Sequence, residues 1–139
     1  MDRKEKQAYR KMQKRHTKAL IKLAKEDRDF DWSYLHELVI TKIKHMYEYY
    51  SAGNNVWQTD ETRVPICIQL NHILQLQEEI DHLYDDLEPV IMEHNPDGSC
   101  TVSRSKESAI KVQALLEKES ELYKSIYTFI GEHIGEWWD

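Results

Sequence analysis

The sequence of 139 residues fits one domain, residues 1–139, that is long enough to bury a core without disulfides or a structural metal. Its formal net charge is −6, and its two cysteines are too far apart for a C-x-x-C metal motif or a disulfide framework. Because no apolar run approaches the length that spans a bilayer and no signal segment is recognisable, we expect a cytoplasmic protein without a membrane segment.

The N-terminal segment, residues 1–28, is strongly basic and predicts a helix from about Arg3 to Lys25. Residues 1–25 contain ten Lys or Arg against two acidic residues. This charge density is typical of contact with phosphates, so one interpretation is nucleic-acid binding through residues 1–25. The alternative is a peripheral helix held electrostatically on the acidic remainder of the chain. The candidate basic surface consists of Arg10, Lys11, Lys14, Arg15 and Lys18.

A second helix is predicted to begin at Asp31 or Ser33, either of which can cap the first N–H groups, and to end near Tyr50. Its apolar stripe at spacings of four and three is Trp32, Val39, Ile43, Met46 and Tyr50, broken by His36 and broadened by Leu35, Leu38 and Tyr49. Tyrosines at 47, 49 and 50 point in different directions around the helix, so at least one is expected at the surface beside cations. Aromatic rings with Lys or Arg hold a base and its phosphate, or anchor a protein partner. The candidate ligand-binding or partner-binding residues are Lys42, Tyr49, Tyr50, Trp57, Arg63 and Trp138.

A third helix is predicted to start with Pro65 in its first turn and to end before Pro89. Its apolar residues alternate steps of four and three, as in the seam between antiparallel helices; they include Ile66, Leu70, Ile73 and Ile80. The same helix carries a candidate acidic surface, which is either a solvated face or an imitation of nucleic acid toward a basic host protein. This surface consists of Glu78, Asp81, Asp85, Asp86 and Glu88.

Carboxylates at helical spacing also raise the question of metal chemistry. Glu78-x-x-Asp81 matches half of the motif of Mg²⁺-dependent all-α nucleotide pyrophosphohydrolases, but no E-x-x-E precedes it. The single E-x-x-H, Glu79 to His82, lacks the second copy that a ferritin-like centre needs. We therefore predict no metal site, no cofactor and no catalytic residue, and keep the pyrophosphohydrolase as the enzymatic alternative.

The remaining chain predicts a short β-hairpin and a long last helix. Asn95, Pro96, Asp97 and Gly98 form a strong turn signal between β-branched residues. The last helix is predicted from about Ser105 to Trp138, with Trp137 in its buried seam. Trp138 points about 100° away, where it either packs under the first helix or contacts a partner. The predicted fold class is all-α: an antiparallel bundle of three to four helices, with a basic N-terminal helix and a short β-hairpin between the last two helices.

Two motifs carry a resemblance to a known group of proteins. A D-W pair opens a helix of the type L-x-x-L-x-x-x-K-x-x-x-M-x-x-Y, and the chain closes with H-I-x-x-W-W-D. The matching positions are Asp31, Trp32, Leu35, Leu38, Lys42, Met46, Tyr49, His133, Trp137, Trp138 and Asp139. In these motifs the chain resembles a group of small helical proteins from tailed bacteriophage genomes.

The resemblance implies a protein made in the cytoplasm of an infected bacterium. In that setting we expect a non-enzymatic binding protein that inhibits a host defence component, either by contacting a host bacterial protein or by capturing a nucleotide messenger. A homo-oligomer with a pocket between protomers is one form of this expectation, and a nucleic-acid-binding accessory protein is a further alternative.

Overall fold

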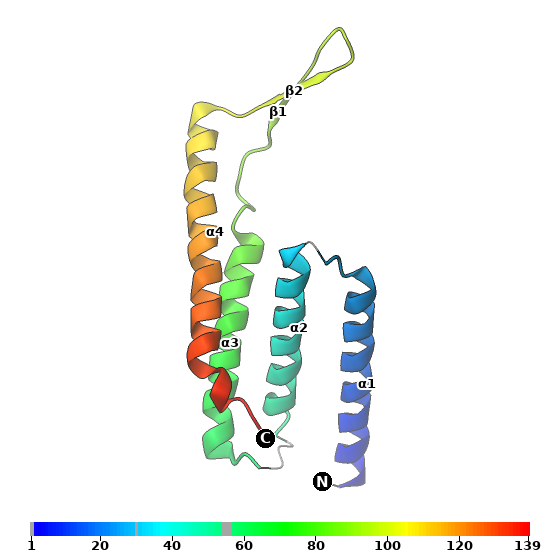
Figure 1. Ribbon diagram of the computed structural model, residues 1–139. Helices are drawn as coiled ribbons and strands as arrows, with labels where there is room; N and C mark the ends of the chain where they lie inside the picture. The colour runs from blue at the N-terminus through cyan, green and yellow to red at the C-terminus, as the bar shows by residue number, and fades with distance from the viewer. Residues whose placement is uncertain (1, 30, 54–56) are drawn as a thin grey trace. The chain divides into compact units, whose positions relative to one another are not determined.

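The computed structural model describes residues 2–29, 31–53 and 57–139 (Figure 1). Within these ranges the chain forms four α-helices and one two-stranded antiparallel sheet, which confirms a mostly helical fold with a hairpin. The helices are α1 (Arg3–Glu26), α2 (Trp32–Ser51), α3 (Asp60–His82) and α4 (Lys106–His133), and a short 3₁₀ helix, η1 (Ile134–Glu136), follows α4. The chain divides into two compact units, Met1–Gln75 with Ile130–Asp139, and Leu76–Phe129.

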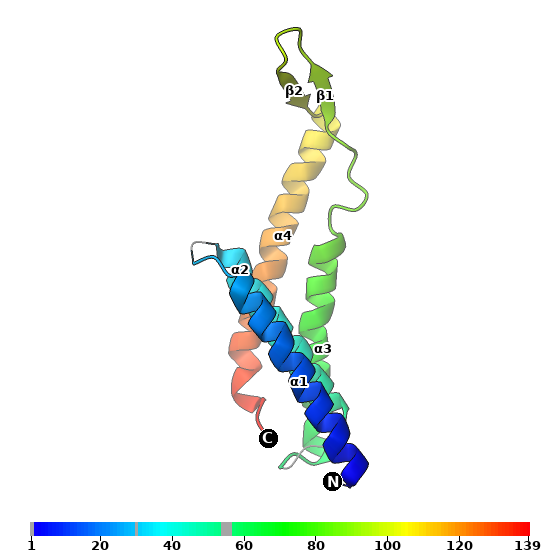
Figure 2. The same cartoon turned by 90° about the vertical axis from the view of Figure 1, so that its right-hand side faces the viewer.

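Helix α1 begins at the predicted residue because Asp2 and Glu5 form a capping box. The Glu5 amide donates to Asp2 Oδ1 at 2.8 Å, and the Asp2 amide donates to Glu5 Oε2 at 2.6 Å. The helix lies beside α2 (Figures 1 and 2). Its few apolar residues at four-three spacing are Tyr9, Met12, Ala19 and Leu23, and of these Leu23 alone is buried, which agrees with the polar composition of the helix.

Helix α2 begins as predicted, with Asp31 as its N-cap accepting the Ser33 amide at 3.0 Å. The predicted stripe is confirmed from Val39 onward, where Val39, Ile43, Met46 and Tyr50 are buried or half-buried, but it is wrong at the start of the helix. His36, Ile40, Ile43 and Tyr50 are buried, whereas Trp32, Leu35 and Leu38 are 63%, 64% and 45% exposed. Leu35 and Leu38 point roughly 100° and 160° around the helix from His36, so they cannot share its face, and Trp32 lies in the first turn.

Both predicted ends of α3 are wrong. The helix starts at Asp60, where the Arg63 amide donates to the Thr59 carbonyl at 2.8 Å, and Pro65 lies inside it. Pro65 is the sixth residue of α3 and has no amide hydrogen to donate to the Glu61 carbonyl, so the helix continues through it without that hydrogen bond. The helix ends at His82, and turns through Leu87 precede Pro89. Within the first unit the predicted seam is confirmed, since Ile66, Leu70 and Ile73 are at most 4% exposed.

The second unit contains the end of α3, the hairpin and most of α4. Strands β1 (Ile91–His94) and β2 (Cys100–Ser103) pair antiparallel, with Ile91 opposite Ser103 and His94 opposite Cys100 (Figure 2). Gly98 takes φ +86° in the connecting turn, and the Asn95 amide donates to the Ser99 carbonyl at 2.8 Å. The predicted hairpin is therefore confirmed. Ile80, Leu122 and Ile126 are the buried apolar side chains of this unit.

The two adjacent C-terminal tryptophans have different environments. The prediction that the last helix reaches Trp138 is wrong, because α4 ends at His133 and the chain tightens into η1. Trp137 is nevertheless 8% exposed, as predicted, and its indole Nε1–H donates to Gln69 Oε1 at 2.8 Å. Trp138 is 61% exposed.

Candidate functional site

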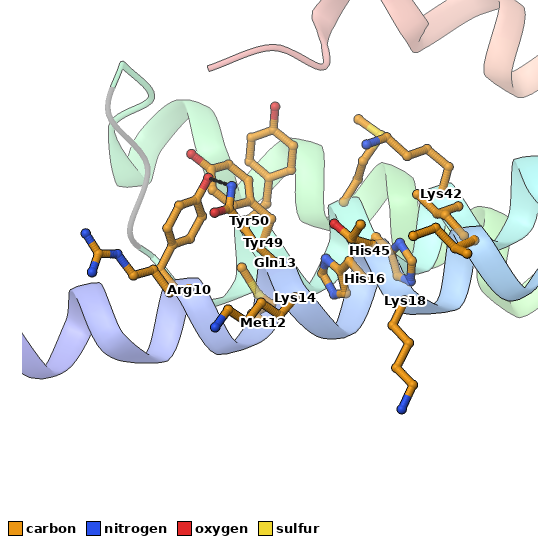
Figure 3. Close-up of a pocket in the computed structure, with 15 residues that line it drawn as sticks. Arg10, Met12, Gln13, Lys14, His16, Lys18, Lys42, His45, Tyr49 and Tyr50 are labelled. Atoms are coloured by element: carbon orange, nitrogen blue, oxygen red, sulfur yellow. Dashed lines mark hydrogen bonds between the residues drawn. The ribbon is translucent and has the colours of Figure 1, made fainter.

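A groove of about 910 Å³ runs between α1 and α2 within the first unit (Figure 3). The helices are antiparallel, because Tyr9 meets Tyr49 with ring centroids 6.0 Å apart and His16 stacks on His45 at 3.8 Å. The walls combine tyrosine rings, aliphatic side chains and cations. The cations that line it are Arg10, Lys14, Lys18 and Lys42. The groove therefore joins the predicted basic surface to part of the predicted ligand-binding set.

These four cations are available for a ligand. All four are exposed, and none forms an ion pair with another residue in the described part of the chain. Arg15 differs from them, because both of its terminal guanidinium nitrogens donate to Glu48. Lys11 is exposed but does not line the groove. The predicted basic surface thus divides into three groove cations, Arg15, which joins α1 to α2, and Lys11, which does neither.

Glu48 is the acidic centre of the contact between α1 and α2. Besides Arg15 it bonds His16, whose Nε2 lies 2.9 Å from Glu48 Oε2. Hydrogen bonds from Arg15 and His16 lower the pKa of the Glu48 carboxyl from 4.5 to about 2. The Glu48 carboxylate is therefore ionised at neutral pH. It balances the positive charge of Arg15 at the contact between α1 and α2, and it does not pair with the groove cations.

The stacked histidines form the centre of the same seam. The rings of His16 and His45 are parallel within 8°, and His45 Nδ1 is buried without a hydrogen-bond partner among the described residues. Burial lowers the pKa of His45 from 6.5, and its electrostatic interactions with His16 and Lys42 lower it further. A neutral His45 is what permits two imidazoles to stack this closely.

Acidification is expected to weaken the contact between α1 and α2 in two stages. Because folding lowers the pKa of His45, the unfolded chain binds more protons below pH 6.5, so this contribution to stability is complete above pH 6.5 and declines as the pH falls. The contribution of Glu48 is complete above pH 4.5 and is lost between pH 4.5 and about 2. Urea unfolding at pH 7.5, 6.5 and 5.5 measures the first stage. His45→Phe should flatten this dependence, whereas His94→Phe on the hairpin should not; equal slopes for all three proteins would contradict the assignment.

Tyr49 connects the groove to the C-terminal residue. Its hydroxyl donates to Asp139 Oδ2 at 2.5 Å, while Asp139 Oδ1 accepts the amides of Trp57 at 2.5 Å and Gln58 at 2.8 Å. Burial and the hydrogen bond to Asp139 raise the pKa of Tyr49 above its ordinary value. Tyr49 is therefore a phenol at neutral pH, with its ring on the groove and its hydroxyl bound.

The other predicted ligand-binding residues do not line the groove. The Arg63 guanidinium donates to the Tyr50 carbonyl at 2.8 Å and to Asp60, so it joins the end of α2 to α3. The indoles of Trp57 and Trp138 are 74% and 61% exposed. The Gln58 side chain donates to the Trp138 carbonyl at 2.5 Å, which places both tryptophans in the neighbourhood of Asp139.

The predicted acidic surface lies in the second unit and is fully solvated. Its five residues, Glu78, Asp81, Asp85, Asp86 and Glu88, are all exposed. Asp85 accepts from His82 Nδ1 at 2.7 Å, which raises the pKa of His82, and Asp81 accepts from Gln77. No group of three or more His, Cys, Asp or Glu in the described ranges is arranged to hold a metal ion.

Several groups in and around the groove had no functional signal in the sequence. Glu48 and His45 are single polar residues whose partners lie on α1, and Asp139 is a single carboxylate whose partners lie on α2 and just before α3. One local signal does exist: His16 continues the four-three spacing of the apolar residues Met12, Ala19 and Leu23 on α1, a position typical of partial burial, and it is half-buried. The pairing of His16 with His45 required the structure.

Comparisons with protein-family models, with characterised proteins and with solved structures find no match to this chain. Among the described residues, no helix combines the length and the apolar character that crossing a membrane requires.

Proposed function

We propose that this is a non-enzymatic binding protein that captures a nucleotide in the groove between α1 and α2. The observation that carries the proposal is that four cations, none in an ion pair within the described ranges, line a groove that also has tyrosine rings in its walls. A base can lie against the ring of Tyr9 or Tyr49. The phosphates can then contact Arg10, Lys14 or Lys42, whose ammonium and guanidinium groups form charge-assisted hydrogen bonds.

The charge distribution supports a small ligand over a long nucleic acid. The ten basic residues among residues 1–25 contrast with a net charge of −6 for the whole chain, so the rest of the chain carries a net negative charge. A long polyanion that extends beyond the groove would meet this acidic surface and be repelled. A ligand that ends within the groove avoids this repulsion.

The biological setting of the proposal comes from the resemblance in the D-W and W-W-D motifs. A phage protein that binds a nucleotide messenger would act in the cytoplasm of the infected bacterium and deprive a host defence component of its signal. Contact with a host bacterial protein is the alternative mode of inhibition, and the exposed indoles of Trp57 and Trp138 support it because tryptophan is a common interface anchor. The antiparallel packing of all four helices and a homo-oligomeric state also belong to this proposal.

Nucleotide binding is expected to stabilise the protein against unfolding. At a ligand concentration of about 100 times Kd, the free energy of unfolding rises by about 2.7 kcal/mol, because the ligand binds only the folded groove. Urea unfolding with and without a panel of AMP, ATP and cyclic mononucleotides and dinucleotides measures this, and calorimetric titration gives Kd.

The double variant Lys14→Glu/Lys42→Glu should weaken binding at least tenfold by replacing attraction with repulsion. Lys111→Glu provides the control, since it reverses an exposed charge on α4 in the other unit. A panel without any stabilising nucleotide, or a double variant that binds like the wild type, would refute the proposal. Release of pyrophosphate from ATP in the presence of Mg²⁺ would instead favour the pyrophosphohydrolase alternative.

A further inference from the structure

The cations of the groove are distributed along its length rather than gathered at one point. On α1 they occupy positions 10, 14 and 18, which are successive steps of four residues on one face. At a rise of about 1.5 Å per residue, Arg10 and Lys18 are separated by roughly 12 Å along the helix axis. This separation exceeds the reach of a single phosphoryl group.

The opposite wall provides an aromatic group near each end of this row. Tyr49 lies across from Tyr9 at the Arg10 end, and His45 lies across from His16 toward the Lys18 end. Lys42 precedes His45 by less than one turn of α2, and its charge is felt by His45. The groove therefore has a cation from α1 at each end and a second cation, Lys42, from α2 at the Lys18 end (Figure 3).

The spacing has an energetic cost in the unbound protein. Like charges four residues apart on a helix destabilise it, and no carboxylate in the described ranges pairs with Arg10, Lys14 or Lys18. Figure 3 draws Lys18 extended away from α2, so its flexible side chain must turn to contact a ligand. A ligand with separated negative charges removes the repulsion at both ends, whereas a ligand with one compact charge removes it at only one.

We infer that the ligand of the groove carries at least two phosphoryl groups separated by a nucleoside, as in a dinucleotide, rather than a single phosphate group or a contiguous polyphosphate. This inference rests on the proposed function, because it names the class of nucleotide that the same groove binds. One phosphoryl group contacts the Arg10 end, and the other is held between Lys18 and Lys42.

Titrations with three probes test the inference: AMP, ATP and the linear 5′-phosphorylated diadenylate pApA. We expect pApA to bind at least tenfold more tightly than AMP and more tightly than ATP. For single-stranded ligands the slope of log K against log salt is about −0.7 per phosphate contacted, so the slope for pApA should be about −1.4 or steeper. The slope for AMP should be about half of this.

Two single variants locate the ends of the ligand. Arg10→Gln and Lys18→Gln should each weaken pApA binding about three- to tenfold and make its salt slope shallower by about 0.7. The affinity for AMP, which has one phosphate, should fall in only one of the two variants. Both side chains are exposed, and Lys111→Gln in the other unit is the matched control.

The outcomes separate the inference from the proposed function. Equal affinities for pApA and AMP, tighter binding of ATP than of pApA, or a Lys18→Gln variant with unchanged pApA affinity would overturn the inference and leave nucleotide binding in place. If none of the three probes binds and cyclic nucleotides also fail to stabilise the protein, both are refuted.

Discussion

Trp137→Ala is expected to lower the free energy of unfolding by about 3–5 kcal/mol, the usual cost of removing a buried aromatic side chain. The indole is only 8% exposed and its Nε1–H donates to Gln69 Oε1 at 2.8 Å, so the substitution leaves a cavity and an amide oxygen without this donor. It also removes the anchor that holds the C-terminal residues against α3 in the first unit. Urea unfolding followed by far-ultraviolet circular dichroism measures the change.

The neighbouring tryptophan provides a matched control for this prediction. Trp138 has the same side chain one position later, but its indole is 61% exposed. Trp138→Ala should therefore change the free energy of unfolding by less than about 0.5 kcal/mol, because a surface side chain leaves no cavity. Similar costs for the two substitutions would show that the environments of the tryptophans are wrongly assigned. Should Trp137→Ala fail to fold, Trp137→Phe, which keeps most of the ring volume, gives the ranking instead.

Asp139→Ala is expected to lower the free energy of unfolding by about 3 kcal/mol. The side-chain carboxylate accepts three hydrogen bonds, from the Tyr49 hydroxyl and from the amides of Trp57 and Gln58. Bonds to a charged acceptor contribute about 1.5–3 kcal/mol each in buried sites, and the exposure of the Trp57 bond reduces the total. The same unfolding experiment measures the loss.

Two further variants separate the bonds that Asp139 accepts. Tyr49→Phe removes only the hydroxyl and should lower the free energy of unfolding by about 1 kcal/mol. Asp139→Asn keeps an acceptor oxygen but loses the charge, so its cost should lie between those of Tyr49→Phe and Asp139→Ala. An Asp139→Ala protein as stable as the wild type would show that this carboxylate does not hold the loop before α3. Because Tyr49 also lines the groove, Asp139→Ala should in addition weaken the proposed nucleotide binding, since the Tyr49 ring loses the hydrogen bond that holds it in place.

Local patterns determined the type and order of the elements. Four-three spacing of apolar residues identified the helices, Asp31 marked the start of α2, and Asn95 to Gly98 marked the hairpin turn. These signals are local, because hydrogen bonding of a cap, the φ of a glycine and the period of a helix act within a few residues. The burial of Trp137 was also predictable from the same spacing, although the chain reaches it through a 3₁₀ helix.

Element ends were less predictable because weak local preferences compete there. The sequence predicts a helix with Pro65 in its first turn, but α3 begins at Asp60 and includes Pro65 in its interior, since Thr59 and Thr62 satisfy the first amides. The sequence also predicts that the last helix reaches Trp138, but the final turn tightens after His133. Ending a helix a few residues earlier or later, or with a 3₁₀ last turn, changes the free energy little, so the surrounding contacts decide where the helix ends.

The sequence by itself determined that the chain is helical, that its first helix is basic and that Lys42, Tyr49 and Tyr50 share a region of α2. Only the tertiary structure decided that these residues face Arg10, Lys14 and Lys18 across one groove, and that Arg63, Trp57 and Trp138 lie outside it. The contacts that set this arrangement join residues far apart in sequence: Arg15 with Glu48 across 33 positions and Tyr49 with Asp139 across 90. Helical periodicity cannot predict such pairs, because it specifies which face of a helix is buried and not which residue of another helix meets it.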